Sequence, residues 1–357
     1  MNYQHLPNYY QGKRVFLTGH TGFKGSWLLY WLHLLGAEVK GYALAPQQEI
    51  DLYHTIQGDQ LCESVIADIR DPNRLQQELL AFEPDFVFHL AAQPLVRLSY
   101  EIPSETFAVN AIGTAYVLDA LRLLKKPCTV VLITTDKVYE NQEWHYPYRE
   151  NDRLGGYDPY SASKACAELV INSYRNCFFN PKEYTTHQKS IASARAGNVI
   201  GGGDWAKDRI IPDIVRALSK EEPITVRNPA AVRPWQHVLE PLGGYLHLGT
   251  KMVEHPVEFA DAWNFGPVAE DNLTVEELVT IALKTWGKGD YQKPNLMGQP
   301  HEAGLLKLDI SKTINILGWK PKYNAMEAIQ ITLDWYIQKL LSTENLTGQQ
   351  IEAFLRV

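Results

Sequence analysis

The stretch that decides the fold is KRVFLTGHTGFKGS, residues 13–26. Residues 13–18 predict a strand and the apolar run 26–35 predicts a helix, with Gly19, Gly22 and Gly25 between them. Glycine lets the backbone turn sharply and approach a pyrophosphate, and the free N–H groups of a helix N-terminus favour anions. A tight turn without a ligand is the alternative. The strand, turn and helix in succession favour a dinucleotide site.

Short strands and longer helices alternate after this stretch. Strands are predicted at 38–44, 64–67, 85–90 and 128–135, and helices at 72–82, 104–124 and 159–177. Such alternation is typical of βαβ units and a parallel sheet. We therefore predict an α/β protein with a Rossmann-type, doubly wound parallel sheet.

The alternation stops near Gly197, where glycine and proline interrupt shorter elements. We expect residues 1–197 to form the NAD-binding domain and 198–357 to form mostly a smaller C-terminal substrate-binding domain. A later strand near 263–265 is expected to return to the first sheet. The chain is expected to close with a helix over 325–341 and a polar tail that frays.

Composition excludes several classes of protein. The chain has 34 basic and 41 acidic residues in 357, a net charge of −7, which argues against nucleic-acid binding through a broad cationic surface. Four dispersed cysteines give neither a disulfide framework nor a metal-binding spacing. The apolar run 27–35 is about half of the roughly 20 residues that a membrane helix needs, and residues 1–12 lack a secretory core. We expect a cytoplasmic protein that binds neither a membrane nor a metal.

A catalytic pair is predicted at the start of the helix 159–177. Asp158 and Pro159 suit the N-cap and first position, and Tyr160 and Lys164 then share a face. An ammonium about 4 Å from a phenol is worth roughly 4 kcal/mol at an effective dielectric of about 20. We therefore expect Lys164 to lower the pKa of Tyr160, which would act as a general base. A solvated helix face is the alternative.

A second group follows the strand that ends near Ile133. Thr135, Asp136 and Lys137 come directly after it, and carboxyl ends of parallel strands face the ligand crevice. We expect these side chains to meet Tyr160 and Lys164 there. A capping turn is the alternative, and the glycine loop favours the catalytic interpretation.

We predict the cofactor contacts along the same edge of the sheet, at the carboxyl ends of its strands. No carboxylate ends the strand 38–44, where NAD-binding proteins commonly have one, and Lys24 in the loop is a feature that could suit NADP. Asp68, after the next strand, is placed to meet the adenine amine, or else is a turn residue. We favour NAD. The predicted cofactor-binding residues are Gly19, Thr21, Gly22, Phe23, Lys24, Gly25, Asp68, Ile69, Leu90, Ala91, Ala92, Tyr160 and Lys164.

With these motifs the chain resembles an extended short-chain dehydrogenase/reductase of the nucleotide-sugar branch. The resemblance runs from the glycine loop to Leu308-Asp309-Ile-Ser-Lys312 and Leu317-Gly318-Trp319-Lys-Pro321. It implies that Thr135 and Tyr160 surround the C4 hydroxyl of a sugar, that Lys164 binds the nicotinamide ribose and that Ala91-Ala92 lie against the cofactor.

The pair after Thr135 separates the chemistries of that branch. Epimerases have small or neutral residues there, and sugar 4,6-dehydratases resemble one another in having Asp and then Glu. Asp136-Lys137 is similar to the pair of the members that dehydrate CDP-glucose, as are the stretches 93–97 and 195–205. The resemblance implies a lyase that converts CDP-D-glucose to CDP-4-dehydro-6-deoxy-D-glucose, for deoxysugar and O-antigen (lipopolysaccharide) assembly. Asp136 would be the acid at C6, and Lys137 the C5 base or an electrostatic stabiliser.

The resemblance also implies contacts with the nucleotide sugar. The predicted substrate-binding residues are Gln93, Asn198, Arg209, Arg233 and Trp235. Arg233 would bind the diphosphate, for which a guanidinium fork is suited, with Asn198 near the same phosphates and Arg209 near the nucleotide contacts. A solvated surface residue is the alternative for each. Trp235 either stacks on the ligand or fills core. Pro234 and Leu239-Glu240 depart from the family pattern and leave the base pocket undefined.

Three alternatives stay open at this point: a nucleotide-sugar 4-epimerase, a 4,6-dehydratase for a dTDP, GDP or UDP sugar, and a non-catalytic NAD(P)-binding regulator. Asp136-Lys137 speaks against the epimerase, and the intact Tyr160 and Lys164 speak against the regulator. The long helices 104–124 and 159–177 resemble those that pair in a family dimer, which implies a homodimer or homotetramer.

Overall fold

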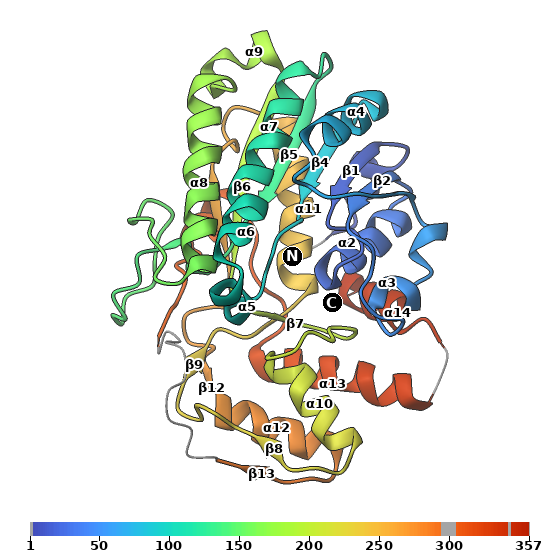
Figure 1. Cartoon of the computed structure of the whole chain (residues 1–357), viewed down its shortest axis with the longest axis vertical. Coiled ribbons are helices and arrows are strands. Elements are labelled where there is room, and N and C mark those ends of the chain that lie inside the picture. The colour runs from blue at the N-terminus through green and yellow to red at the C-terminus, as the bar shows by residue number, and fades with distance from the viewer. Residues whose placement is uncertain (1–2, 294–304, 342–343, 357) are drawn as a thin grey trace.

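The computed structural model describes residues 3–293, 305–341 and 344–356. Its centre is a seven-stranded sheet in the order β3-β2-β1-β4-β5-β6-β11, with every neighbouring pair parallel (Figure 1). The strands are β1 (Arg14–Thr18), β2 (Glu38–Ala43), β3 (Glu63–Ile66), β4 (Phe86–His89), β5 (Cys128–Ile133), β6 (Lys189–Ala196) and β11 (Ala262–Phe265). The order reverses between β1 and β4, as in a doubly wound Rossmann sheet, so the predicted fold class is confirmed.

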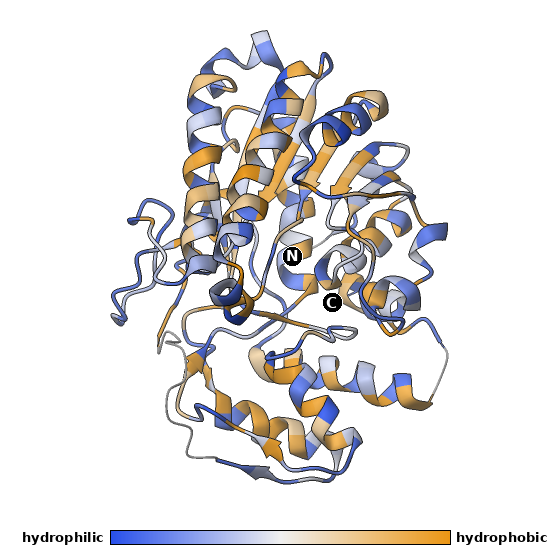
Figure 2. Ribbon diagram, viewed as in Figure 1, coloured by the Kyte–Doolittle hydropathy of each residue, from blue (hydrophilic) through white to orange (hydrophobic). Residues whose placement is uncertain are grey.

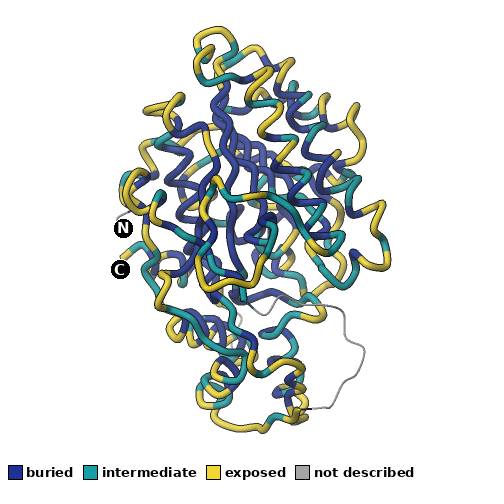
Figure 3. The backbone as a smooth tube through the Cα atoms, turned by 90° about the vertical axis from the view of Figure 1, so that its left-hand side faces the viewer, coloured by how far each residue is buried: buried dark blue, intermediate teal, exposed yellow. Residues whose placement is uncertain are grey.

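Helices cover both faces of the sheet (Figure 1). One face carries α4 (Pro72–Phe82), α7 (Gly113–Leu123) and α8 (Pro159–Cys177), and the other carries α2 (Phe23–Leu34) and α11 (Leu239–Glu254). Alternate residues of a strand point to opposite faces, so Val15 and Leu17 join one core and Phe16 the other. Most residues of β4 and β5 are hydrophobic (Figure 2). Because both faces are covered, β4, β5, β6 and β11 are buried along their whole length (Figure 3), whereas the edge strand β3 exposes Glu63 and Ile66.

The predicted helix 104–124 is interrupted. It consists of α6 (Pro103–Phe107), a π-helical turn η2 (Ala108–Ile112) and α7. Asn110 lies in this turn, is fully buried and donates to Ser163 Oγ on α8 at 2.9 Å. A polar bond in the middle of the packed face accompanies the wider turn, and such turns often mark functional sites.

Part of the chain after β6 forms a smaller set of elements beyond the carboxyl ends of the strands (Figure 1), whereas α11 packs on the large sheet. Its helices are α10 (Ile210–Ser219), α12 (Val275–Trp286) and α13 (Ala325–Leu341), and its two-residue strands are β7 (Val199–Ile200), β8 (Ile224–Thr225), β9 (Val232–Arg233), β10 (Gln236–His237), β12 (Leu273–Thr274) and β13 (Tyr291–Gln292). The strand expected near 263–265 is β11, which pairs with β6 and so returns to the large sheet as predicted.

The expectation of a fraying tail is wrong. Residues Leu346–Arg356 form α14, which packs against α2. Leu346, Ile351 and Phe354 are buried, and Phe354 stacks on Tyr3 with ring centroids 5.5 Å apart. Apolar residues at helical spacing inside a polar sequence give this helix a buried face.

Short helices complete the described chain: α1 (Pro7–Tyr10), α3 (Leu52–Thr55), η1 (Gly58–Gln60), α5 (Val96–Glu101), η3 (Asp136–Val138), η4 (Pro181–Glu183), α9 (Tyr184–His187) and η5 (Thr313–Leu317). Across residues 3–293, 305–341 and 344–356, no helix is long and apolar enough to cross a membrane. Within the same ranges, no three His, Cys, Asp or Glu side chains are grouped so that they could hold a metal ion.

Candidate active site

The glycine loop joins β1 to α2 and is packed too tightly for side chains at two of its three glycines. Gly19 has a φ of +76°, and a Cβ there would lie 2.8 Å from the backbone nitrogen of Ala91. A Cβ on Gly25 would lie 1.9 Å from the carbonyl oxygen of Gly19. Gly22 is different, because it is exposed and a Cβ there would meet only the Gly19 oxygen at 3.5 Å. The backbone of the loop is therefore accessible to a ligand at Gly22.

The loop fits a dinucleotide phosphate. Gly22 is the N-cap of α2, a helix of twelve residues, and no side chain caps its first N–H groups. These N–H groups and the positive end of the helix dipole favour an anion at that point. Thr21 fixes the loop from the other side, because its Oγ1 donates to the carbonyl of Leu44 at 2.8 Å. Phe23 lies against Gly201, 3.2 Å from the place of a Cβ there.

The end of β4 lies directly beside the loop. The backbone nitrogens of Leu90 and Ala91 each donate to Thr18 Oγ1 at 3.1 Å. Thr18 also bonds Nδ1 of His89 at 2.7 Å. The structure thus brings Leu90, Ala91 and Gly19 together, as the sequence predicted for a cofactor edge.

Asp68 follows β3 at the same edge, where Arg70 engages its carboxylate. Arg70 Nη2 lies 2.6 Å from Asp68 Oδ2, and this partner holds the pKa of Asp68 below its ordinary value. The next residue, Ile69, is buried against Gly113 of α7. Contact of Asp68 with an adenine amine stays a prediction.

The predicted catalytic residues converge beyond the end of β5. Thr135 caps the 3₁₀ turn η3, and its hydroxyl donates to Asp136 Oδ1 at 2.9 Å. Lys137 Nζ also lies 3.0 Å from Asp136 Oδ1 and 3.0 Å from Asn198 Oδ1. Asp136 is buried, whereas the side chain of Lys137 is 27% exposed. A buried carboxylate, a lysine and an asparagine are therefore connected at one strand end.

Tyr160 enters this group from the first turn of α8. Asp158 caps the helix as predicted, accepting from the Ser161 nitrogen at 2.9 Å. The phenol is buried and hydrogen-bonded to Thr135, and the charges of Asp136 and Arg209 act on it. Thr135, Asp136 and Tyr160 therefore lie together at the end of β5. The backbone N–H of Tyr160 donates to Ser99 Oγ at 3.1 Å.

The expected lowering of the Tyr160 pKa is wrong for this structure. Burial raises the pKa to about 12, and the interaction with Thr135 and the charge of Arg209 offset only part of that. Lys164 Nζ donates to the carbonyl of Ile133 at 3.3 Å. Burial lowers the pKa of Lys164 to about 8, against the opposing charge of Glu168. Helical spacing placed both residues on one face correctly, but it could not show the burial of the phenol or the carbonyl that holds the amine.

Two further basic side chains interact electrostatically with this group. Lys24 Nζ donates to the hydroxyl of Tyr245 at 3.0 Å, and burial, Lys164 and Arg209 together lower its pKa to about 7. Arg209 Nη1 pairs with Asp204 Oδ2 at 2.8 Å. Burial thus weakens the positive charge of Lys24, and Asp204 balances that of Arg209.

Two other predicted substrate-binding residues, Arg233 and Trp235, differ in how deeply they are buried. Arg233 is half-buried on β9, and its Nη1 donates to the carbonyl of Val232 at 3.1 Å. Pro234, the next residue, borders Gly197, as does the Oδ2 oxygen of Asp136. Trp235 is 6% exposed and packs in the main core, which favours the core alternative. Ligand contact of Arg233 and Trp235 stays a prediction.

Gln93 is held inside the protein by its own loop. Its Nε2 donates to Leu95 O at 3.1 Å and to Thr106 Oγ1 at 2.9 Å, and its Oε1 accepts from Leu95 N at 2.6 Å. Asn110 bonds both backbone groups of Gln93. Sequence reasoning missed Asn110, although a polar residue on the apolar face of a predicted helix was a usable signal. The predicted substrate contact of Gln93 is untested.

A glycine loop at the switch point of a parallel sheet, with a Tyr-x-x-x-Lys helix beside a Thr at the end of β5, defines a dinucleotide-dependent short-chain dehydrogenase/reductase. The chain belongs to the GDP-mannose 4,6 dehydratase family within that class, whose model matches residues 16–332.

Known proteins similar to the chain are nucleotide-sugar enzymes. A CDP-glucose 4,6-dehydratase of Salmonella typhimurium is 50% identical over 329 residues, 92% of each chain. A dTDP-glucose 4,6-dehydratase of Streptomyces antibioticus is 30% identical over 332 residues, 90% of this chain and 92% of its own. A solved dTDP-glucose 4,6-dehydratase of Streptomyces venezuelae with NAD bound has a TM-score of 0.75 and 25% identity, covering 93% of this chain and 99% of that one.

Proposed function

We propose that the chain converts CDP-D-glucose to CDP-4-dehydro-6-deoxy-D-glucose and water, with NAD as its cofactor. The observation that carries the proposal is the Asp136–Lys137 pair, joined through Oδ1 at 3.0 Å beside Thr135 and Tyr160. The 50% identity to a CDP-glucose 4,6-dehydratase supports the choice of substrate. An epimerase needs no acid for a leaving hydroxyl, so this pair favours dehydration.

NAD, when bound, supplies a hydride acceptor for C4 and a hydride donor for C6, so the reaction has no net oxidation. The backbone of the glycine loop and the open N-terminus of α2 fit its pyrophosphate. Lys164 would hold the nicotinamide ribose, and Leu90 to Ala92 would lie against the cofactor.

Tyr160 and Thr135 would act at C4 of the sugar. The phenol would take the C4 hydroxyl proton, and the Thr135 hydroxyl would donate to the same oxygen. The pKa of about 12 makes Tyr160 a weak acid, so the positive charge of Lys164 and Arg209 must favour its anion during the reaction.

Asp136 and Lys137 would carry out the elimination. The C5 hydrogen becomes acidic once C4 is a ketone, and the C6 hydroxyl leaves as water when it is protonated. Transfer of one proton from Lys137 Nζ to Asp136, across 3.0 Å, converts the ion pair into a neutral amine and a carboxylic acid. The amine can then remove the C5 proton, while the acid protonates the C6 hydroxyl.

The choice of nucleotide is tested by incubating the protein and NAD with CDP-, dTDP-, UDP- and GDP-glucose. We expect a 4-keto sugar, seen by its ultraviolet absorbance in base, from CDP-glucose at a rate at least about tenfold above the others. Absence of product from CDP-glucose would overturn the proposal. Product from another nucleotide sugar alone would leave a dehydratase of different specificity.

Replacement of Lys137 by methionine should slow product formation by at least about 100-fold, because proton transfer by a positioned side chain contributes roughly 10² to 10⁴ in rate. Deuterium incorporation at C5 from D₂O, read by mass spectrometry, should fall in the same proportion. Lys182→Met, at an exposed position far along the chain, is the control. Deuterium entry as fast as in the parent would rule out both roles of Lys137, base and electrostatic stabiliser.

The proposal extends to a homodimer or homotetramer in the cytoplasm. All four cysteines are free thiols, which suits a reducing compartment. Leu123 of α7, and Leu169 and Phe178 at α8, are 44% or more exposed, which leaves an apolar surface for a second copy. Sedimentation or gel filtration at micromolar concentration tests this directly, and a monomer would contradict it.

A further inference from the structure

Glu168 and Arg195 form an ion pair buried between α8 and β6. Arg195 Nη2 lies 2.9 Å from Glu168 Oε2, and the side chains are 5% and 3% exposed. The mechanism above uses neither residue. Buried ion pairs are often no more stabilising than apolar side chains of similar volume, so their presence beside the site calls for another role.

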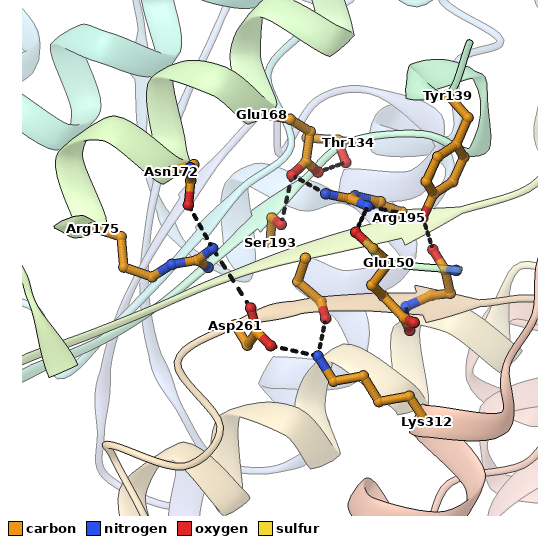
Figure 4. Close-up of polar contacts among 12 residues, drawn as sticks. Thr134, Tyr139, Glu150, Glu168, Asn172, Arg175, Ser193, Arg195, Asp261 and Lys312 are labelled. Carbon is orange, nitrogen blue, oxygen red and sulfur yellow. Dashed lines mark hydrogen bonds and ion pairs between the residues drawn. The ribbon is translucent and has the colours of Figure 1, made fainter. Parts of the chain in front are cut away.

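The Glu168 end of the pair holds the residue before the catalytic turn. Glu168 Oε1 accepts from Thr134 Oγ1 at 2.5 Å, and Oε2 accepts from Ser193 Oγ at 2.9 Å. Figure 4 shows these groups pointing toward one another from α8, the end of β5 and β6. Glu168 is also one helical turn beyond Lys164. One carboxylate therefore connects the helix of Tyr160 and Lys164 to the start of the turn 135–137.

The Arg195 end holds the residue after the same turn. Arg195 Nη1 donates to the hydroxyl of Tyr139 at 2.9 Å, and its guanidinium lies 5.1 Å from the centre of the Tyr139 ring (Figure 4). The Tyr139 hydroxyl in turn donates to Asn264 Oδ1 on β11 at 2.7 Å. Thr134 and Tyr139 flank the catalytic turn, so both of its ends are bound to one ion pair.

We propose that Glu168 and Arg195 are positioning residues, which fix the turn that carries Thr135, Asp136 and Lys137 against the helix that carries Tyr160 and Lys164. The inference rests on the proposed function for its catalytic consequence. A displacement of the reacting groups by about 1 Å lowers the reaction rate strongly. A buried ion pair bonded to the residues at both ends of the turn restrains the turn more firmly than solvent-exposed bonds would.

The charge of Glu168 adds a second, separable effect. Burial alone would raise the pKa of Glu168, but Arg195 holds it below its ordinary value, so the carboxylate is ionised. Its charge opposes the burial that lowers the pKa of Lys164. From other elements, Lys24 on α2 and His89 on β4 interact with the charge of Lys164, and neither supplies negative charge. Loss of the Glu168 charge therefore makes Lys164 lose its proton at lower pH.

The first test is amide hydrogen exchange of the full-length protein in Glu168→Gln and in Glu168→Leu/Arg195→Met. The double variant replaces the pair with apolar side chains and keeps the protein foldable if the single variant does not fold. We expect residues 134–139 to exchange at least about tenfold faster in both variants. Unchanged exchange there would overturn the proposal, whichever substrate the protein uses.

The second test is the kinetics with CDP-glucose. We expect kcat to fall at least about tenfold in both variants, with KM within about threefold, because Arg209 and Arg233 are untouched. In Glu168→Gln, the alkaline limb of the kcat profile should also move to lower pH. Parent kcat and an unmoved alkaline limb would mean that the pair is structural only. Failure of the parent to act on CDP-glucose would contradict the proposed function. The hydrogen exchange of residues 134–139 would then be the test of the positioning role.

Glu78→Gln is the matched control. Glu78 on α4 pairs with Lys40 of β2 at 2.9 Å, with side chains 13% and 7% exposed, far along the sheet from β5. This variant also breaks a buried pair between helix and strand. It should change neither the exchange of residues 134–139 nor the alkaline limb, and a change equal to that of Glu168→Gln would contradict a positioning role.

Discussion

Replacement of Tyr160 by phenylalanine is expected to slow CDP-glucose conversion by at least about 100-fold while the protein stays folded. The phenol is buried beside Thr135, and the ring itself fills the space. Removal of the hydroxyl takes away the group that accepts the C4 proton, and such groups contribute roughly 10² to 10⁴ in rate. The rate of 4-keto sugar formation is the measurement.

The pH dependence of the parent protein's rate should report the ionisation of Tyr160. Since burial holds the pKa of Tyr160 at about 12, the phenolate fraction rises with pH throughout the range of the assay. The parent rate should therefore increase from acid toward neutral pH, until Lys164, whose burial lowers its pKa to about 8, loses its proton. The residual rate of Tyr160→Phe should lack the acid limb.

Tyr10→Phe is the control for this variant. Tyr10 is also buried, and its hydroxyl donates to the carbonyl of Leu246 on α11 at 2.8 Å. Its loss should cost about 1 kcal/mol of stability and leave the rate unchanged. A rate for Tyr160→Phe within about threefold of the parent would exclude Tyr160 as the base.

The parts that the sequence predicted well are those in which local pattern and packing agree. The loop 19–25, the N-cap at Asp158 and the return of β11 each followed from spacing, turn residues or apolar runs. The pKa of Tyr160 could not be predicted, because it depends on burial by distant segments. The partners of Glu168 lie on β6 and just after the end of β5, and no periodicity along α8 identifies them.

Elements that depend on non-local contacts were also missed. The tail 346–356 looked polar, yet its few apolar residues find a surface built by α2 and Tyr3. At the π-helical turn, the side chain of Asn110 bonds Gln93 and Ser163, two residues that lie elsewhere in the chain. In both places tertiary contacts, not helix propensity, decide the local structure.

Replacement of Gly25 by alanine is expected to lower the free energy of unfolding by about 3 kcal/mol or more and to abolish measurable NAD binding. The added methyl would lie 1.9 Å from the carbonyl oxygen of Gly19, and no rotamer change can relieve a clash between a Cβ and backbone. Overpacking usually costs about 1 to 3 kcal/mol, occasionally more. Denaturant unfolding and calorimetric titration with NAD measure the two effects.

Gly22→Ala in the same loop separates packing from ligand contact. Its methyl would meet only the Gly19 oxygen at an ordinary 3.5 Å, with a φ of −76° that alanine tolerates. We therefore expect stability within about 1 kcal/mol of the parent, since only an N-cap glycine is lost, but weaker NAD binding, because the methyl stands where the phosphate would approach. Equal stability of the two variants would show that the contact between Gly25 and Gly19 does not require glycine. Parent-like NAD affinity in Gly22→Ala would place the phosphate elsewhere than at the exposed start of α2.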